Sequence, residues 1–333
     1  MKKITAYHQF NQEECTFTGS LNLTAIFPAV CRISVFLLTA ALVMGFLAGC
    51  ASKKPRLEYA TWQDHKYPVG TILSSSEKGP VTFEKMLKDL LQSRIVYVGE
   101  SHTNAAHHDV QLRILLGLHM FRPDLSTGME MFSRPYQSVL DEWVKGELDE
   151  QAFIRNTHWY ANWKYDYELY RGLLEYIRDQ GIPLYALNIA FHVPPKIAAG
   201  GIDSLLAEDK ARLPEQIDLS NQDHREFVRD IFEQHSFGRG DRHFEHFYEA
   251  QCVWEDVMAE SISNNIANRP MIVFAGKGHL ANRYGIPDRA YTRTGVSFKI
   301  LLPVSAGQSI NFEEADYFWI TPSSGQSPRQ SPH

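Results

Sequence analysis

Arg94-Ile-Val-Tyr-Val-Gly-Glu-Ser-His102 and Pro270-Met-Ile-Val-Phe-Ala-Gly-Lys-Gly-His279 are two hydrophobic runs that end in the same way. A run of β-branched and aromatic residues is typical of a parallel strand that is covered on both faces. Each run then enters the pattern G-x-x-H. Because ligands of open α/β sheets bind beyond the carboxyl ends of the strands, the two histidines are expected at one rim.

Further strands are predicted on both sides of these two, and helices are predicted between them. The short apolar segment Thr127-Gly-Met-Glu-Met-Phe132 carries an acid, Glu130, where a core strand would not be expected to have one. Strands are also predicted at Ile182–Asn188 and Val296–Leu302, and helical segments alternate with the strands. This order predicts an α/β fold with a mainly parallel sheet flanked by helices. A helical insertion subdomain is predicted at about residues 202–268.

The N-terminal region predicts export and lipid attachment. An apolar stretch ends in Leu47-Ala48-Gly49-Cys50, which resembles a bacterial lipobox, and it is too short for a comfortable membrane span. The resemblance implies cleavage before Cys50 and lipid on its thiol and new amino terminus; an ordinary signal peptide or a short anchor helix is the alternative. Ala51 and Ser52 do not form an Asp-type inner-membrane retention signal, so the outer membrane is expected. The predicted organisation is a signal peptide with an over-extended N-terminus at 1–49, a tether at 50–80, an α/β domain at 81–320 and a disordered tail at 321–333.

Composition excludes one class of partner. The formal net charge is −6, and no basic run or arginine-rich stripe of the kind that neutralises phosphates is present, so nucleic acid is not an expected partner. Of the four cysteines, Cys50 and Cys252 follow the predicted cleavage site. If Cys50 is acylated, Cys252 has no partner, and its apolar helical surroundings favour a buried, inert thiol.

His102, Glu130 and His279 are the candidate site residues. At strand ends they can ligate a metal ion jointly, act as acid and base, or line a pocket for a polar ligand. The sequence leaves these alternatives open. His107 and His108 fall in the following helix and are expected to be solvated or to cap it.

An aromatic tract lies between the second and third predicted strands. It runs Trp159-Tyr-Ala-Asn-Trp-Lys-Tyr-Asp-Tyr-Glu-Leu-Tyr170. Most of these side chains are expected to pack in the core, where a helix covers the sheet. A flat apolar ligand also needs aromatic walls, however, and a phenolate is a known ligand of haem iron, so one tyrosine of the tract is a candidate ligand.

Several segments together resemble the ChaN-like haem-binding lipoproteins, within a superfamily that includes the Tiki and TraB proteins and the erythromycin esterases. The likeness spans about residues 83–289. It rests on Gly99-Glu-Ser-His102, Gly128-Met-Glu-Met-Phe132, Tyr170-Arg-Gly-Leu-Leu-Glu-Tyr176, Ala186-Leu-Asn188, Ala250-Gln-Cys-Val-Trp-Glu-Asp-Val-Met-Ala259, Gly276-Lys-Gly-His-Leu280 and Gly285-Ile-Pro-Asp-Arg289. The resemblance implies a lipid-anchored protein that binds haem, connected with iron uptake. It further implies a homodimer with haems stacked at the interface and an outer-membrane haem receptor as partner.

The resemblance also implies a set of site residues. Tyr170 is the first choice as ligand of the haem iron, and His102, Glu130 and His279 match the acidic and histidine positions of the superfamily. Glu100, in the first G-x-x-H, is assigned to the same cofactor site. Arg283 and Arg289 are candidates for the haem propionates, with ordinary surface charge as the alternative. The competing hypothesis is an enzyme, namely a metal-dependent or acid-base hydrolase that uses His102 and Glu130, with His279 as ligand or base.

Overall fold

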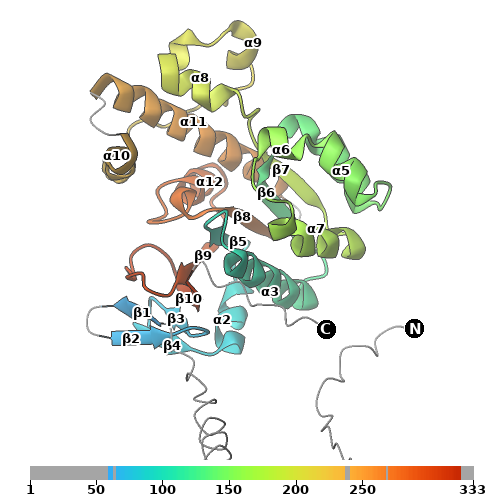
Figure 1. Ribbon diagram of the computed structural model, residues 1–333, viewed down its shortest axis with the longest axis vertical. Helices are drawn as coiled ribbons and strands as arrows, with labels where there is room; N and C mark the ends of the chain where they lie inside the picture. Colours follow the sequence, from blue (N-terminus) through green and yellow to red (C-terminus); the bar gives the residue numbers. More distant parts are fainter. Residues whose placement is uncertain (1–58, 63–64, 237–240, 268, 324–333) are drawn as a thin grey trace, which may run out of the picture. The chain divides into compact units, whose positions relative to one another are not determined.

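A central sheet of eight strands organises the fold (Figure 1). The computed structural model describes residues 59–323 except 63–64, 237–240 and 268. The strand order is β4-β3-β10-β9-β5-β8-β6-β7, in which neighbours from β10 to β7 are parallel and β3 is antiparallel to β10 and β4. The strands are β3 (Ile72–Ser74), β4 (Gly79–Val81), β5 (Ile95–Glu100), β6 (Ser126–Ser133), β7 (Leu184–Asn188), β8 (Met271–Gly276), β9 (Phe298–Ser305) and β10 (Tyr317–Thr321). The predicted α/β class, with a mainly parallel sheet, is confirmed.

Helices cover both faces of the sheet because its central strands are apolar on both faces. In β5, Ile95 and Tyr97 pack in the core cluster that includes α11 and α12, whereas Val96 and Val98 pack in the cluster that includes α2, α3, α4 and α7. This alternation follows from the two-residue period of a strand. The helices named here are α2 (Phe83–Leu90), α3 (Ala105–Phe121), α4 (Gln137–Val144), α7 (Glu168–Gln180), α11 (Asp241–Asn265) and α12 (Ile286–Thr294).

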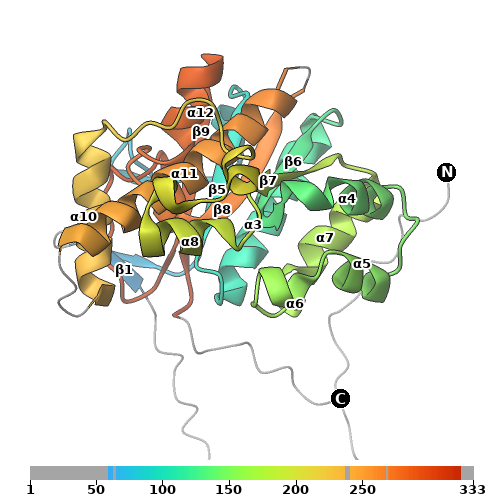
Figure 2. The ribbon, with the colours of Figure 1, turned by 90° about the horizontal axis from the view of Figure 1, so that it is seen from above.

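A group of helices follows β7 and precedes β8 in the chain. In space it lies near the carboxyl ends of the parallel strands (Figures 1 and 2). It begins at Val193, earlier than the residue 202 expected from the sequence. Helix α11 is its longest member and packs against α8, α10, α12 and β7. The group consists of α8 (Val193–Gly200), η2 (Ile202–Ser204), α9 (Ala207–Lys210), α10 (Gln222–Ser236) and α11. The shorter elements α5 (Glu150–Asn156) and α6 (Trp159–Asn162) lie between α4 and α7.

The segment expected to be a tether contains strands. β1 (Tyr59–Trp62) pairs with β2 (His65–Pro68), and β3 and β4 extend the main sheet beyond β10. Ile72 and Leu73 are buried there, so the assignment of this whole segment to a tether was wrong. Polar turns separate these short strands, and β10, with which β3 pairs, was not predicted.

The two ends of the chain fall largely outside the described residues. Residues 1–58, which include the predicted signal peptide and Cys50, are among those not described, as are residues 324–333 of the predicted tail. Thr321, at the start of that tail, ends β10. Among the residues that are described, no helix is long and apolar enough to cross a membrane.

Candidate active site and cofactor pocket

The first G-x-x-H places His102 directly beyond the carboxyl end of β5, as predicted. The His102 Nδ1 lies 2.7 Å from the Glu100 Oε1. Glu100 itself is buried, and it also accepts hydrogen bonds from the Tyr170 hydroxyl at 2.7 Å and the Gln111 amide at 2.8 Å. A carboxylate at this nitrogen fixes both the ring orientation and the tautomer. His102 therefore presents its Nε2 as the remaining functional nitrogen.

Glu130 lies where the regular pairing of β6 stops. Strand β6 pairs with β8 only as far as Met129, and its register with β7 is irregular between Met129 and Ser133. The Glu130 Oε2 accepts a 2.6 Å hydrogen bond from the backbone N–H of Gly276, at the end of β8. An acid can therefore occupy this otherwise apolar strand. Its carboxylate lies where the regular pairing stops, and it is hydrogen-bonded to the end of the adjacent strand β8.

His279 lies between two buried carboxylates. Its Nε2 is 3.5 Å from the Glu130 Oε1, and its Nδ1 is 3.1 Å from the Glu255 Oε1 on α11. The Gln251 amide lies 3.0 Å from the same Nδ1. The structure thus brings His102, Glu130 and His279 together at the carboxyl edge of the sheet, as the sequence predicted.

The carboxylates and the histidines of this cluster stabilise each other's charged forms. Burial alone would lower the pKa of His279, but Glu130 and Glu255 raise that pKa to about 10, so the ring is cationic at neutral pH. Burial would raise the pKa of Glu130, but His279, His102 and the Gly276 N–H together lower it. For His102, burial opposes the positive charge, yet the hydrogen bond to Glu100 and the charges of Glu130 and Glu100 raise its pKa.

The absence of a side chain at Gly276 allows the close packing of His102 against the end of β8. A Cβ atom at Gly276 would lie 2.9 Å from the His102 Cε1 and 3.5 Å from the Glu130 Oε2. The first distance is shorter than van der Waals contact allows. The glycine of the second G-x-x-H therefore leaves room for the histidine of the first.

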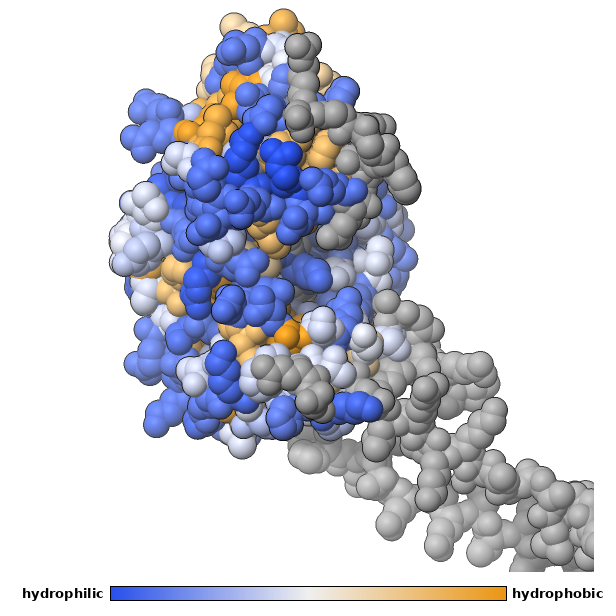
Figure 3. Space-filling model, turned by 90° about the vertical axis from the view of Figure 1, so that its left-hand side faces the viewer, coloured by the Kyte–Doolittle hydropathy of each residue, from blue (hydrophilic) through white to orange (hydrophobic). Residues whose placement is uncertain are grey.

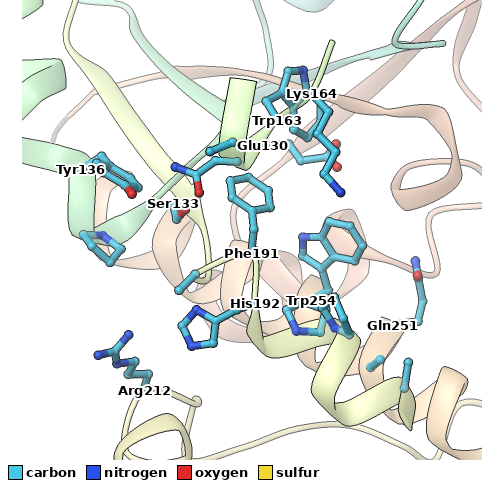
Figure 4. A pocket seen from close by; sticks show the side chains of 18 of the residues that line it. Glu130, Ser133, Tyr136, Trp163, Lys164, Phe191, His192, Arg212, Gln251 and Trp254 are labelled. Carbon is cyan, nitrogen blue, oxygen red and sulfur yellow. The ribbon is translucent and has the colours of Figure 1, made fainter. Parts of the chain in front are cut away.

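A cavity of about 780 Å³ lies above this cluster, within the range typical of small-molecule sites. His102 and Glu130 form part of its floor. Its walls are aromatic and come from segments far apart in sequence, and the labelled members are visible in Figure 4. They are Tyr136, Trp163, Tyr165, Phe191, Phe247 and Trp254. A cavity with these walls suits a flat apolar ligand.

Basic side chains also line the cavity. Lys164 follows the wall residue Trp163, His192 directly precedes α8, and Arg212 comes from the helical group between β7 and β8. In Figure 4, Lys164 lies on the side of Trp163, whereas His192 and Arg212 lie on the far side of Phe191. Lys164 and Arg212 are exposed. The cavity therefore combines apolar walls with positive charge that can bind an anionic group.

The face of the molecule in Figure 3 is mainly hydrophilic, with scattered apolar areas.

Tyr170 is not a wall of the cavity. Its side chain is fully buried, its hydroxyl donates to Glu100, and burial, followed by the charge of Glu100, raises its pKa well above the ordinary value. A buried phenol with this partner cannot reach a ligand in the cavity, so the structure does not support Tyr170 as the iron ligand. Glu100 is likewise absent from the lining and supports His102 from beneath.

Other assignments from the sequence also need correction. Arg289 is buried and binds Glu255 and Asp256, away from the cavity, because α12 packs on α11. Arg283 pairs with Asp316 at 2.9 Å and does not line the cavity either. Neither arginine is placed to bind a ligand there.

His107 and His108 are buried, contrary to the expectation that they are solvated. The His107 Nδ1 accepts a 2.9 Å hydrogen bond from the Ser101 N–H, and burial lowers its pKa to about 3. His108 lies 3.1 Å from the His102 carbonyl oxygen. Both rings therefore hold the loop after β5 in place. Asn104 caps the N-terminus of α3, where its side chain accepts a hydrogen bond from the Ala106 N–H.

The predicted burial of Cys252 is confirmed. Burial is the largest cause that raises the pKa of the Cys252 thiol, to about 12, so the thiol is protonated at neutral pH.

Within the described part of the chain, no three histidine, cysteine, aspartate or glutamate side chains are arranged to hold a metal ion. Both ring nitrogens of His279 already face protein groups. The contacts of both nitrogens weaken the interpretation of His279 as a metal ligand.

The sequence did not single out several residues of the cavity. Phe191 and His192 follow the end of β7, so the strand-end rule that found His102 could have found them. Trp254 lies in one of the segments that carried the family resemblance, but helical periodicity alone does not tell which helix face meets the sheet edge. Tyr165 lies in the aromatic tract without a local signal that separates it from its neighbours.

Comparisons with known proteins agree with this geometry. The family model described as haem-binding uptake, Tiki superfamily, ChaN matches residues 86–290, which is more than half of the chain. No curated protein sequence matches significantly. Among solved structures, the chain is similar to ChaN of Campylobacter jejuni with cofacial haem binding, with 17% identity and a TM-score of 0.63 over 74% of this chain and 95% of that one.

More distant structural similarities carry no argument about function. The type III effector HopBA1 has a TM-score of 0.43 at 12% identity, over 81% of this chain and 99% of that one. An erythromycin esterase mutant in its open conformation has a TM-score of 0.41 at 10% identity, over 67% and 72% of the two chains. The family match over residues 86–290 is decisive: the chain belongs to the ChaN family of haem-binding uptake proteins in the Tiki superfamily.

Proposed function

We propose that this protein binds haem in the cavity at the carboxyl edge of the sheet. The observation that carries the proposal is the cavity itself, because aromatic walls and cationic side chains meet there in one space of about 780 Å³. A porphyrin needs apolar walls for its faces and cations for its propionates. Membership of the ChaN family supports the same ligand.

Tyr165 is the residue that we propose as the iron ligand, in place of Tyr170. It is the tyrosine of the aromatic tract that lines the cavity, and its ring centroid lies 4.8 Å from that of His102. Burial, followed by the charges of Glu130 and Glu100, raises the pKa of its phenol. A haem iron, when bound, supplies a Lewis acid that a phenolate can coordinate. Lys164 and Arg212 are the proposed partners of the propionates.

Titration of the purified protein with ferric haem, followed in the Soret region, tests this assignment. Wild-type protein should develop a saturable, shifted band. Tyr165→Phe should change the position of the band and weaken binding by about tenfold or more, because the phenolate bond is lost. Tyr160→Phe is the matched control, since Tyr160 belongs to the same tract but is exposed and outside the cavity. An unchanged spectrum for Tyr165→Phe would refute the ligand assignment.

The cellular role that we propose is haem or iron uptake by a lipid-anchored protein of the outer membrane. The lipobox-like segment before Cys50 supports the anchor, and family membership supports the uptake role. Metabolic labelling with palmitate should tag wild-type protein but not Cys50→Ser.

Haem-dependent dimerisation, suggested by the cofacial haem binding of the Campylobacter protein, should appear as a doubled mass in sedimentation on addition of haem. An outer-membrane haem receptor is the expected partner.

An acid-base hydrolase is the second candidate function. The Glu100–His102 pair favours it, because an oriented imidazole at the floor of a cavity can serve as a general base. This activity would show turnover of ester or amide substrates that His102→Ala abolishes. Turnover that survives a chelator would indicate acid-base chemistry, whereas turnover that a chelator abolishes would indicate a metal-dependent hydrolase. Absence of turnover by the wild-type protein over a broad panel of such substrates would count against this function.

A further inference from the structure

Glu255 is a buried carboxylate that lies behind the wall of the cavity. Its side chain is fully inaccessible to solvent, and it contacts side chains from α10, α12 and the 3₁₀ turn η3 (Lys277–His279). Glu255 does not line the cavity. A charge in such a place needs compensating partners, because burial without them is costly.

The two oxygens of Glu255 face different partners. The Oε1 accepts a 2.7 Å hydrogen bond from the Gln251 amide and lies 3.1 Å from the His279 Nδ1. The Oε2 lies 3.1 Å from the His224 Nε2 and 3.4 Å from the Arg289 Nε. One oxygen therefore faces the site, while the other is held by the helices around it.

We infer that Glu255 is a positioning residue that orients His279 toward Glu130 at the floor of the cavity. The inference rests on the proposed function only in taking this cavity as the ligand site. With its Nδ1 held by Glu255, the ring of His279 points its Nε2 at Glu130, 3.5 Å away. Glu130 in turn lines the cavity, so Glu255 acts on the floor through His279.

The electrostatics of the cluster support this chain of contacts. The charged groups that face His279 are Glu130 from β6 and Glu255 from α11, with His102 nearby beyond the end of β5. The two carboxylates stabilise its positive charge more than burial and His102 oppose it. Burial would raise the pKa of Glu255, but His224 and His279 lower it strongly, so Glu255 is ionised at neutral pH.

The same helix carries part of the wall. Trp254 precedes Glu255 in α11, and its ring centroid lies 5.2 Å from that of His279. Gln251, one turn earlier, lines the cavity and contacts both Glu255 and His279. Loss of the carboxylate charge is therefore expected to disturb floor and wall together.

Removal of the charge of Glu255, with its shape retained, tests the inference. The protonation of His279 is followed by NMR in the full-length, haem-free protein, in which the histidine rings are isotopically labelled. Glu255→Gln should lower the midpoint of the His279 titration by about one to three pH units, as expected for loss of an opposite charge in contact. Asp256→Asn is the matched control: Asp256 is a buried acid on the same helix, but it binds Arg289 and Arg293 rather than His279. It should leave the midpoint within about half a unit.

The inference is overturned if both variants lower the midpoint equally or if Glu255→Gln leaves it unchanged. Should Glu255→Gln fail to fold, Glu255→Asp draws the carboxylate back from His279 and should give a smaller decrease, and no decrease would then overturn it. Because this readout needs no haem, it stands apart from the proposed function. A protein that shows the His279 shift but binds no haem would refute only the haem proposal.

Discussion

Gly276 connects the two halves of the site at the scale of a single residue. Because a Cβ atom here would lie 2.9 Å from the His102 ring, Gly276→Ala should displace His102 and lower the free energy of unfolding by about 1–3 kcal/mol. Gly278→Ala is the matched control, since a Cβ at Gly278 meets nothing within 4 Å. Urea unfolding of both variants measures the difference. Equal stability of the two would contradict the packing at Gly276.

The His279–Glu130 pair predicts how stability depends on pH. The pKa of His279 is raised from 6.5 to about 10, so its contribution is complete below about pH 6.5 and is lost as the pH rises through about 10. The pKa of Glu130 is lowered, so its contribution is present above about 4.5 and is lost as the pH falls through the folded value. The free energy of unfolding should therefore decline on the alkaline side, by at most about 1.4 kcal/mol per pH unit for this histidine.

Chemical denaturation between pH 6 and pH 10.5 measures that decline. His279→Gln keeps a donor toward Glu130 but does not titrate, so its alkaline slope should be shallower than that of the wild type. Parallel slopes would show that His279 is not the responsible group.

The sequence predicted the meeting of His102, Glu130 and His279 because strand-end positions follow from a parallel sheet. It could not predict which tyrosine of the aromatic tract lines the cavity. Tyr165 and Tyr170 are both aromatic positions in one tract, and their roles differ because Tyr170 turns inward to Glu100. That difference arises from tertiary packing and has no counterpart in the local sequence.

At the scale of helices and strands, the packing of α12 on α11 depends on a buried ionic cluster. Arg289 on α12 contacts Glu255 and Asp256 on α11, and its side chain is only 4% exposed. Arg289→Met removes one cationic partner from each of these two buried carboxylates and should cost about 3–5 kcal/mol of stability.

Arg283→Met provides the control for this prediction. Arg283 pairs with Asp316, but its side chain is 36% exposed, so its loss should cost about 0–1 kcal/mol. Thermal and urea unfolding measure both changes. Neither substitution should weaken haem binding by removal of a direct contact, because neither arginine lines the cavity. Similar small costs for both would contradict a structural role for Arg289.

Predictability also differs between elements. The long apolar strands β5 and β8 were predictable from composition, since a run of β-branched residues bounded by glycine has few other interpretations. The strands of residues 59–81 were not, because each is only three or four residues long, and β3 depends on β10 at the far end of the chain. Pairing across such a separation is set by tertiary structure rather than by local pattern.

At the scale of the whole molecule, the cavity forms where the helical group between β7 and β8 lies over the carboxyl edge of the sheet. The sequence indicated both parts, but it did not indicate how α8 and α11 approach the strands, which determines the lining. Ala198 on α8 lines the cavity, whereas its neighbour Ala199 is exposed and does not. This pair offers a direct way to fill the cavity while the helix is otherwise preserved.

Equilibrium titration with ferric haem of wild type, Ala198→Trp and Ala199→Trp tests the central claim most directly. Wild type and Ala199→Trp should bind haem saturably with equal affinity, and Ala198→Trp should bind at least about tenfold more weakly because the indole occupies the cavity. Circular dichroism confirms that all three are folded. Absence of saturable binding by the wild type, or equal affinity of Ala198→Trp, would contradict haem binding in this cavity.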